Sequence, residues 1–390
     1  MNQAWYSELP EARDEEIRAA LDRACARVQR NLPQFTTQYQ SACSTDLQYK
    51  PIANTDWTNG FWTGEIWLAY EHTQNEQFKN AALIQVRDFE RRIAQGIQVD
   101  HHDLGFLYSL SCVAGWKLTG DETARRAALM AVDKLITRFQ EKGEFIQAWG
   151  EMGVAENYRL IIDCLLNLPL LYWASETSGD PRYADIAQRH IHTAMNCVVR
   201  EDYSTIHTFY FDPHSGKPLR GVTHQGNRDG SAWARGQAWG VYGTILSYQY
   251  TQDPKILTLF EKISDYYLRH LPQDLVPFWD FDFTDGSSEP RDSSSAAIVI
   301  CAFLEAARTL DQQKAAYYSR WARQMMKSLL DHYEVKDDSR CNGLLLHGTY
   351  NRSTPTNTCR NEGVDECCSW GDYYYMEALT RFLKDWNRYW

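Results

Sequence analysis

Two aspartates occupy unusual positions in this sequence, because each of them adjoins or lies within an apolar stretch. Asp103 ends a short polar segment, residues 101–103, and a long apolar run over residues 104–118 follows it directly. Asp163 lies within residues 160–166, an almost wholly apolar segment. A carboxylate in such surroundings is costly unless it is paired or protonated. The pKa of Asp163 is therefore expected to be raised, which suits a general acid near neutral pH.

Each aspartate also has a purely structural interpretation. Asp is favoured at the start of a helix, where its carboxylate accepts free backbone N–H groups, so Asp103 fits a helix cap. Asp163 fits a buried structural carboxylate that is bonded to a neighbouring backbone group or tyrosine. Two aspartates at the openings of apolar helices favour an acid/base pair. Capping and catalysis are compatible if one oxygen of Asp103 serves each role.

A set of aromatic, imidazole, amide and guanidinium side chains accompanies the two aspartates, near the predicted helix openings or in adjoining loops. Flat aromatic faces and hydrogen-bonding groups together suit a carbohydrate. Arg235, which lies among tryptophans and glycines, suits a clamp for a carboxylate or hydroxyl, although it also fits a core helix whose Arg reaches an internal Asp. The predicted binding residues are Trp57, Phe61, His102, Trp149, His207, His224, Gln225, Trp233, Arg235, Gln237 and Trp239.

A repeated pair of helices is predicted to position these residues. In each copy, a segment that is apolar nearly all round precedes a short turn and an amphipathic segment with charges on one face. The first pattern is typical of a helix surrounded by protein, and the second of a helix at the surface. The apolar segments open near residues 57, 102, 156, 231, 291 and 369, and an amphipathic helix over residues 11–30 precedes them.

This helix pattern predicts an all-α fold, an (α/α)6 barrel of six inner and six outer helices. The longer connections lead into the inner helices, so the pocket is expected where those helices begin and their positive N-termini favour an anion. In the connection 201–230, Thr208–Phe211 and the turn residues 212–216 predict a small β-hairpin. No linker rich in Pro, Gly or Ser divides the repeats, so residues 1–390 are predicted to form a single domain.

Charge and composition argue against several classes of protein. The chain of 390 residues has a net charge of -11, which disfavours a nucleic-acid or membrane-surface protein. It lacks the long apolar run of a membrane helix and, at its acidic N-terminus, an apolar signal core, so a cytoplasmic protein is expected. Its ten cysteines are then expected to be reduced. A late cysteine cluster lacks zinc spacing, so no metal site is expected at Cys341, Cys359, Cys367 and Cys368.

Four motifs together make the sequence resemble the unsaturated glucuronyl hydrolases, which form glycoside hydrolase family 88. The resemblance extends from about Trp57 to Tyr375 and implies an (α/α)6 barrel, in agreement with the helix count. The motifs are His102-Asp103-Leu104-Gly105-Phe106, Ile162-Asp163 with Asn167-Leu168-Pro169, Trp233-Ala234-Arg235-Gly236-Gln237-Ala238-Trp239, and Cys368-Ser369-Trp370-Gly371-Asp372-Tyr373-Tyr374.

The resemblance also implies a reaction and roles for the residues. Members of this family remove the 4,5-unsaturated glucuronic acid that polysaccharide lyases leave at the non-reducing end of glycosaminoglycan oligosaccharides, by hydration of the C4=C5 double bond. By resemblance, Asp163 protonates C4 and then takes a proton from the water that adds at C5, while Asp103 is the second essential carboxylate. The predicted binding residues match positions that line the family's pocket. The chemistry needs no metal or organic cofactor.

One region departs from the family's pattern. Members that favour sulfated substrates carry an Arg at the position that aligns with His224, together with a Ser-x-x-Ser-x-Lys motif. This chain has no lysine there and reads Ser353-Thr354-Pro355-Thr356-Asn357-Thr358. We therefore expect a preference for unsulfated or lightly sulfated disaccharides of the chondroitin or hyaluronan type.

The sequence leaves three other functions open. An unsaturated rhamnogalacturonyl hydrolase of the same fold would act on pectin fragments. A sugar epimerase on this fold would usually rely on paired histidines, and a carbohydrate-binding protein would bind unsaturated disaccharides without consuming them. An oligosaccharide that contains an unsaturated uronic acid is the expected partner, and a monomer or weak homo-oligomer is the expected state.

Overall fold

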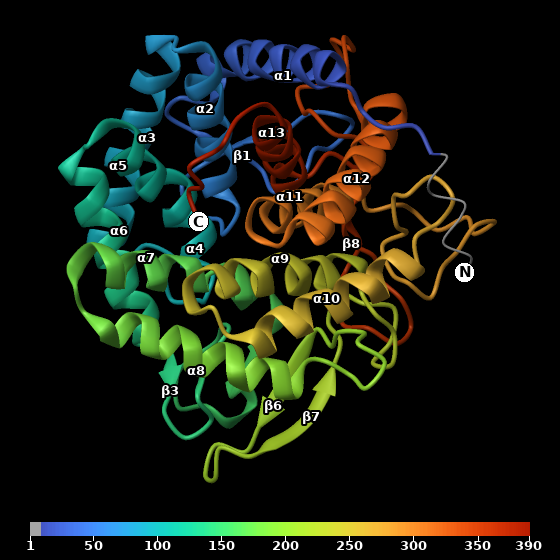
Figure 1. The fold of residues 1–390 in the computed structure, drawn as a ribbon. Helices are drawn as coiled ribbons and strands as arrows, with labels where there is room; N and C mark the ends of the chain where they lie inside the picture. Colours follow the sequence, from blue (N-terminus) through green and yellow to red (C-terminus); the bar gives the residue numbers. More distant parts are fainter. Residues whose placement is uncertain (1–8) are drawn as a thin grey trace.

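Two concentric rings of helices surround one core in the computed structural model, which describes residues 9–390 (Figure 1). Within that range the inner ring has six members, as predicted. A π-helical turn, Ser109–Val113, joins α4 to α5, so these two count as one inner helix. The inner helices are α2 (Asn59–Thr73), α4 (Leu104–Tyr108) with α5 (Ala114–Thr119), α7 (Leu168–Ser178), α9 (Ala234–Thr251), α11 (Ser293–Thr309) and α13 (Ser369–Leu383).

The outer ring also has six helices in residues 9–390, so the predicted α/α barrel is confirmed. Five of them begin at an Asn or Asp whose side chain accepts a backbone N–H of the first turn. These caps end the short turns that lead out of the inner helices. The outer helices are α1 (Asp14–Phe35), α3 (Glu76–Ala94), α6 (Glu122–Ile136), α8 (Pro181–Cys197), α10 (Pro254–Arg269) and α12 (Gln312–Ser328), which continues into a π-helical turn (Leu329–Tyr333).

Burial follows the pattern that the sequence predicts. In α9 every residue from Ala234 to Ser247 is buried, whereas α10 buries only the side that carries Ile256, Phe260 and Ile263. A helix that is covered on all sides cannot carry unpaired charge. Asp103, Asp163 and Arg235 accordingly lie at or before the starts of inner helices.

The last residues of the chain close the end of the barrel where the inner helices terminate. Lys117 Nζ, at the end of α5, donates to the Arg388 carbonyl at 2.7 Å, and an Arg308 guanidinium nitrogen of α11 donates to the Trp386 carbonyl at 2.6 Å. Trp390 is fully buried and stacks on Tyr374, with ring centroids 5.9 Å apart. The opposite end, where the inner helices begin, is built from longer loops and short strands.

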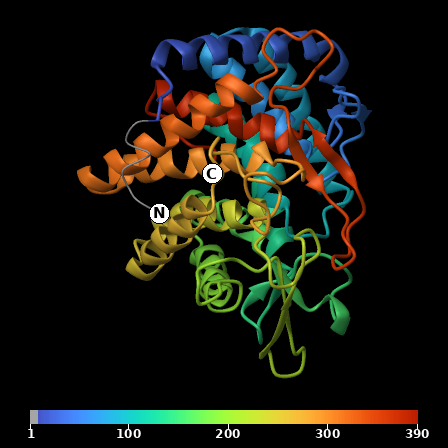
Figure 2. The same cartoon turned by 90° about the vertical axis from the view of Figure 1, so that its right-hand side faces the viewer.

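The predicted β-hairpin is present, and it is part of a larger sheet. Strands β6 (Thr208–Phe211) and β7 (Pro218–Val222) pair antiparallel, and the hairpin extends from one edge of the barrel (Figures 1 and 2). A third strand, β5 (Arg159–Ile161), pairs with β6. Three further two-stranded pairs, which the sequence did not reveal, are β1 (Tyr39–Gln40) with β2 (Pro51–Ile52), β3 (Phe139–Gln140) with β4 (Phe145–Ile146), and β8 (Gly348–Asn351) with β9 (Glu362–Glu366).

Strand β5 corrects one prediction about the third inner helix. The sequence predicted a helix that starts near residue 156 and runs through Asp163. Instead, β5 leads into a 3-10 helix, Ile162–Leu166, and α7 begins only at Leu168. Pairing of β5 with β6 and the β-branched residues before Asp163 favour the extended conformation. Asp163 therefore lies at a junction between a strand and a helix rather than inside a helix.

Other sequence expectations concern compartment and metals. In the described part of the chain, no helix is both long and apolar enough to cross a membrane. All ten cysteines are free and buried. No group of three or more His, Cys, Asp or Glu side chains in residues 9–390 could hold a metal ion. The first half of the acidic N-terminal segment, residues 1–8, lies outside the described residues.

Two glycines on inner helices test the close packing of the ring. A Cβ on Gly60 would lie 2.1 Å from the Phe106 carbonyl oxygen, whereas a Cβ on Gly240 would meet nothing closer than 3.4 Å. Gly60→Ala is therefore expected to lower the free energy of unfolding by about 1–3 kcal/mol. Gly240→Ala should be neutral or stabilising by up to about 1 kcal/mol, because Ala is preferred to Gly inside a helix. Urea unfolding measures both, and equal stability of the variants would contradict contact between α2 and α4.

Candidate active site

A cavity of about 200 Å³ opens at the end of the barrel where the inner helices begin. This is the end at which the sequence predicted a pocket. The N-terminal ends of α4 and α9 and the long connections contribute its walls. The lining residues are Trp57, His102, Asp103, Trp149, Asp163, His224, Gln225, Trp233, Arg235, Tyr350 and Asn351.

Asp103 occupies the N-cap position of α4, as predicted, but its carboxylate is not the cap. Within residues 9–390 that side chain accepts no hydrogen bond from the first turn, so the predicted sharing of its oxygens between helix and pocket is wrong. The oxygens face two imidazoles instead: His102 Nε2 lies 3.2 Å from Oδ1, and His101 Nδ1 lies 3.3 Å from Oδ2. Burial alone would raise the pKa of Asp103, but His102, His101 and Arg138 together lower it below its ordinary value. Asp103 is therefore ionised at neutral pH.

Asp163 reaches the cavity from the 3-10 helix that follows β5. Its Oδ1 is buried and has no hydrogen-bond partner among the described residues. Burial, and to a lesser extent the negative charge of Asp103, raise the pKa of this carboxyl to about 7, while the positive charge of Arg235 opposes the rise. A protonated Asp163 and an ionised Asp103 thus line the same cavity. Such a division between two carboxyl groups is what acid/base chemistry requires.

His102 is held as a neutral imidazole beside Asp103. Burial lowers its pKa to about 4, although the charge of Asp103 acts in the opposite direction. Its Nε2 faces Asp103 Oδ1 at 3.2 Å, and no described residue hydrogen-bonds to its buried Nδ1. His102 thereby orients Asp103 without neutralising its charge.

Arg235 is fixed by a buried ion pair at the start of α9. Its guanidinium donates to the carboxylate of Asp292, and both side chains are almost completely buried. Further hydrogen bonds of 2.6 Å each reach the carbonyl oxygens of Thr349 and Tyr350. The guanidinium also lies 4.5 Å from the ring centroid of Trp233. The sequence left open whether Arg235 binds a ligand or an internal Asp, and the structure shows that it pairs with Asp292 while also lining the cavity.

Flat aromatic side chains form two walls of the cavity. Trp57 stacks on Trp370 with ring centroids 5.4 Å apart, and its Nε1 donates to the Tyr350 hydroxyl at 3.0 Å. Trp149 lies at the opening with 37% of its surface exposed, and the guanidinium of Arg159 lies 5.1 Å from its ring centroid. Held rings of this kind offer apolar faces to a sugar ring at little entropic cost.

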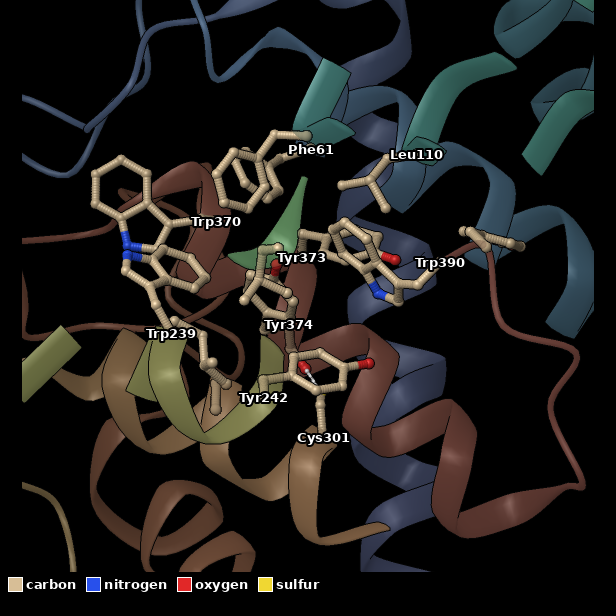
Figure 3. Close-up of a cluster of buried hydrophobic side chains, with 14 of the residues drawn as sticks. Phe61, Leu110, Trp239, Tyr242, Cys301, Trp370, Tyr373, Tyr374 and Trp390 are labelled. Carbon is tan, nitrogen blue, oxygen red and sulfur yellow. Dashed lines mark hydrogen bonds between the residues drawn. The ribbon is translucent and has the colours of Figure 1, made fainter. Parts of the chain in front are cut away.

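Four of the predicted binding residues do not line the cavity. Phe61 and Trp239 are fully buried in the aromatic cluster behind it (Figure 3). The ring of Phe61 packs against Phe106, and that of Trp239 packs against Tyr374. Gln237 accepts from the Thr205 N–H and donates to the carbonyls of Tyr203 and Ile263, so its amide joins α9 to a loop and to α10. The fourth residue, His207, lies behind Gln225.

An amide chain connects His207 to a wall residue that the sequence did not reveal. His207 Nε2 lies 3.0 Å from Gln225 Oε1, and Gln225 Nε2 donates to Asn351 Oδ1 at 2.7 Å. Asn351 and Tyr350 lie on β8, in a region where the sequence shows no helix opening. Only the alternation of a short strand could have indicated them, and four residues are too few to make that pattern distinctive.

Comparison with known proteins gives a consistent result. The model for Glycosyl Hydrolase Family 88 matches residues 28–382. The chain is 47% identical over 387 residues to the unsaturated chondroitin disaccharide hydrolase of Streptococcus pneumoniae, covering 99% of this chain and 96% of the relative. The crystal structure of an unsaturated glucuronyl hydrolase from Streptococcus agalactiae superposes with a TM-score of 0.95 at 45% identity, covering 100% of this chain and 97% of the other.

A liganded structure is also similar. An Asp-to-Asn variant of the S. agalactiae unsaturated glucuronyl hydrolase, complexed with dGlcA-GalNAc6S, superposes with a TM-score of 0.87 at 41% identity. That comparison covers 100% of this chain and 97% of the other. Both protein comparisons and structural comparisons therefore extend over the whole barrel.

Replacing Asp163 and replacing Asp103 should change the free energy of unfolding in opposite directions. The folded state keeps Asp163 protonated up to about pH 7, whereas an unfolded Asp ionises near pH 4; wild-type stability is therefore lost as the pH rises between these values. Asp163→Asn cannot ionise, so from pH 4.5 to pH 8 it should gain stability relative to wild type, on the order of 2–4 kcal/mol.

The matched variant Asp103→Asn should behave in the other direction. The folded-state pKa of Asp103 is lowered, so its stabilising contribution is present above the unfolded pKa and is lost as the pH falls through the folded pKa. The variant should be less stable than wild type at pH 8, with a smaller difference at low pH. Thermal unfolding at several pH values measures both, and shifts of the same sign would contradict a protonated Asp163 beside an ionised Asp103.

Proposed function

The chain belongs to glycosyl hydrolase family 88, and we propose that it removes 4,5-unsaturated glucuronic acid from the non-reducing end of lyase-generated glycosaminoglycan oligosaccharides. The observation that carries this proposal is the pair of carboxyl groups in one cavity, with the pKa of Asp163 raised and that of Asp103 lowered. The names of the similar S. pneumoniae and S. agalactiae enzymes support the same substrate class.

The reaction is acid-catalysed addition of water to the C4=C5 double bond. Protonated Asp163 gives its proton to C4, and the oxygen of a water molecule bonds to C5. The Asp163 carboxylate then takes a proton from that water and is protonated again at the end of the step. The hemiketal formed at C5 opens and releases the partner sugar. A pKa of about 7 suits both halves of this cycle, because the group must donate and then accept at similar pH.

Asp103 supports this cycle without moving a proton. As a carboxylate it accepts hydrogen bonds from sugar hydroxyls, and its charge helps to keep Asp163 protonated before substrate binds. The same charge stabilises the positive charge that develops at C5 when C4 is protonated. A neutral His102 beside it leaves this charge intact.

Arg235 and the N-terminus of α9 bind the carboxylate of the substrate's uronic acid. Arg235 lines the cavity as a fixed cation whose orientation is set by Asp292. The N-terminus of α9, which begins at Ala234, adds a partial positive charge at the same place. The rings of Trp57 and Trp149 bind the apolar faces of the sugars. Phe61, Trp239, Gln237 and His207 act behind these residues by holding them in place.

Replacement of either aspartate tests the assignment. Asp163→Asn should lower turnover of an unsaturated chondroitin disaccharide by about 10²–10⁴-fold, the usual contribution of a general acid/base, and Asp103→Asn should also be severe. Loss of the ultraviolet absorbance of the C4=C5 bond measures turnover. Asp253→Asn makes the same change at an N-cap of the outer helix α10, where Asn also caps well; it is the matched control and should keep wild-type activity. Activity of Asp163→Asn within tenfold of wild type would refute the assignment.

The loop that includes Thr358 bears on substrate sulfation. Thr358 Oγ1 lies 2.6 Å from His224 Nδ1, and His224 lines the cavity. Burial lowers the pKa of His224, and the nearby Arg159 lowers it further, so the ring is neutral at pH 7. A neutral imidazole and a hydroxyl at this edge of the cavity provide no cation for a sulfate group. We therefore propose a preference for unsulfated or lightly sulfated disaccharides.

This preference can be tested by adding the missing charge. Wild type should have a higher kcat/KM on an unsulfated than on a 6-sulfated unsaturated chondroitin disaccharide, and Thr358→Lys should raise the ratio of sulfated to unsulfated kcat/KM about tenfold, as expected for one charge-assisted hydrogen bond. Thr358→Met supplies similar length without charge and should leave the ratio unchanged. A wild-type enzyme that clearly prefers the sulfated substrate would overturn the proposal.

A further inference from the structure

The first turn of α4 is capped from another part of the chain. The backbone N–H of Phe106 occupies the third position of this helix, which the side chain of an N-cap Asp normally satisfies. In this protein that N–H donates to Asn167 Oδ1 at 2.9 Å, although Asp103 is the N-cap residue. Asn167 lies 61 positions further along the chain and is completely buried.

The other end of the same amide reaches the backbone of Asp163. Asn167 Nδ2 donates to the Asp163 carbonyl oxygen at 3.3 Å. The Asn167 side chain therefore joins α4, which follows Asp103, to the 3-10 helix that carries Asp163. Its donor and its acceptor are both used, and neither bond involves a carboxylate.

Gly105 makes this link possible. A Cβ at residue 105 would lie 2.4 Å from Asn167 Cα, 2.7 Å from its Oδ1 and 2.9 Å from its Cβ. Such distances do not occur between real atoms, so any side chain at Gly105 would displace Asn167 or separate the two segments. The glycine is required at this position for close approach rather than for an unusual backbone conformation.

We propose that Asn167 is a positioning residue that caps α4 in place of Asp103, thereby keeping the Asp103 carboxylate turned toward the cavity and fixing its spacing from Asp163. This inference rests on the proposed function and adds to it the residue that holds the two carboxylates apart. Without Asn167, the Phe106 N–H is a buried donor that lacks a partner, which destabilises the helix start. The nearest replacement acceptor by position in the helix is the Asp103 carboxylate itself.

Loss of the link changes the electrostatics of Asp163 in a predictable direction. The charged groups that act on Asp163 are Asp103 on the α4 side and Arg235 on the α9 side; those that act on Asp103 are His101, His102 and Arg138. If Asp103 turns to cap α4, its charge moves away from Asp163. The pKa of Asp163 then falls, and the basic limb of the pH–rate profile, above which the general acid is ionised, moves to lower pH.

Asn167→Ala tests the proposal with two independent readouts. A crystal structure of the substrate-free variant should show an Asp103 carboxylate oxygen within hydrogen-bond distance of the Phe106 nitrogen. On the unsaturated chondroitin disaccharide, kcat should fall about 10- to 100-fold, as for a misplaced reacting group, and the basic limb of kcat/KM should move down by at least half a pH unit. An Asp103 that stays turned to the cavity, or an unmoved basic limb, overturns the proposal.

Two further variants control for folding and for charge. Asn342 makes the same pair of bonds at a site that does not line the cavity, accepting from the Tyr49 N–H at 2.7 Å and donating to the Tyr49 carbonyl at 3.3 Å. Asn342→Ala should cost comparable stability while kcat stays within twofold and the basic limb does not move. If the basic limb of the pH–rate profile moves equally in Asn342→Ala, the shift comes from a general loss of stability, and the proposal is overturned.

Asn167→Asp keeps the volume of the side chain and serves if the Ala variant does not fold. It retains the acceptor for Phe106, so Asp103 should stay turned to the cavity, but it adds a negative charge beside Asp163 and should move the basic limb upward. A rotated Asp103 in this variant overturns the proposal. Because the crystal structures need no substrate, a wild-type protein that fails to consume the disaccharide would refute the proposed function while the positioning role is still decided.

Discussion

A carboxyl group that is removed from water beside a second, ionised carboxylate keeps its proton to unusually high pH. The barrel imposes this condition on Asp163, whose Oδ1 is buried without a partner in the described structure and whose pKa is raised by the negative charge of Asp103 as well as by burial. A fully hydrogen-bonded Asp163 would be more stable, but it would ionise near its ordinary pKa. In the proposed mechanism, the raised pKa of this desolvated group permits proton transfer to carbon at neutral pH, and the surrounding structure must tolerate the cost of burying it.

The inner helices supply that tolerance because their ends are tied together by buried polar groups. Asp292 at the start of α11 holds Arg235 of α9, and it also accepts from the Ser294 hydroxyl, to which Trp370 of α13 donates at 2.9 Å. Trp370 in turn stacks on Trp57 before α2. The Arg235 cation, the Asp292 carboxylate and the two tryptophan rings therefore belong to one connected network at the mouth of the barrel. The aromatic cluster in Figure 3 includes Trp370 and therefore adjoins this network directly.

The sequence predicted the barrel because its signal is repetitive. Six apolar segments that alternate with amphipathic ones leave few alternatives. Asp103 is conspicuous because a long apolar run follows it directly, and Asp163 because it interrupts an apolar run. Apart from the hairpin of β6 and β7, the short strands could not be predicted, since strands of two to five residues carry little periodicity. Strand β5 replaced a predicted helix because its partner, β6, lies about fifty residues away, and such pairing is invisible locally. The capping of α4 by Asn167 instead of Asp103 could not be predicted for the same reason. Local spacing favours a helix capped by its own N-cap residue, and only the fold brings Asn167 to the Phe106 N–H.

The proposed mechanism requires the two aspartates to have opposite protonation states in the free enzyme at neutral pH. Carboxyl ¹³C NMR titration of the substrate-free protein, with Asp163→Asn and Asp103→Asn used to assign the two signals, measures this directly. Asp163 should titrate near pH 7, and Asp103 should titrate below its ordinary value. An Asp163 signal that titrates near pH 4, in the range of an ordinary aspartate, would contradict this mechanism, because no general acid would then be available at neutral pH.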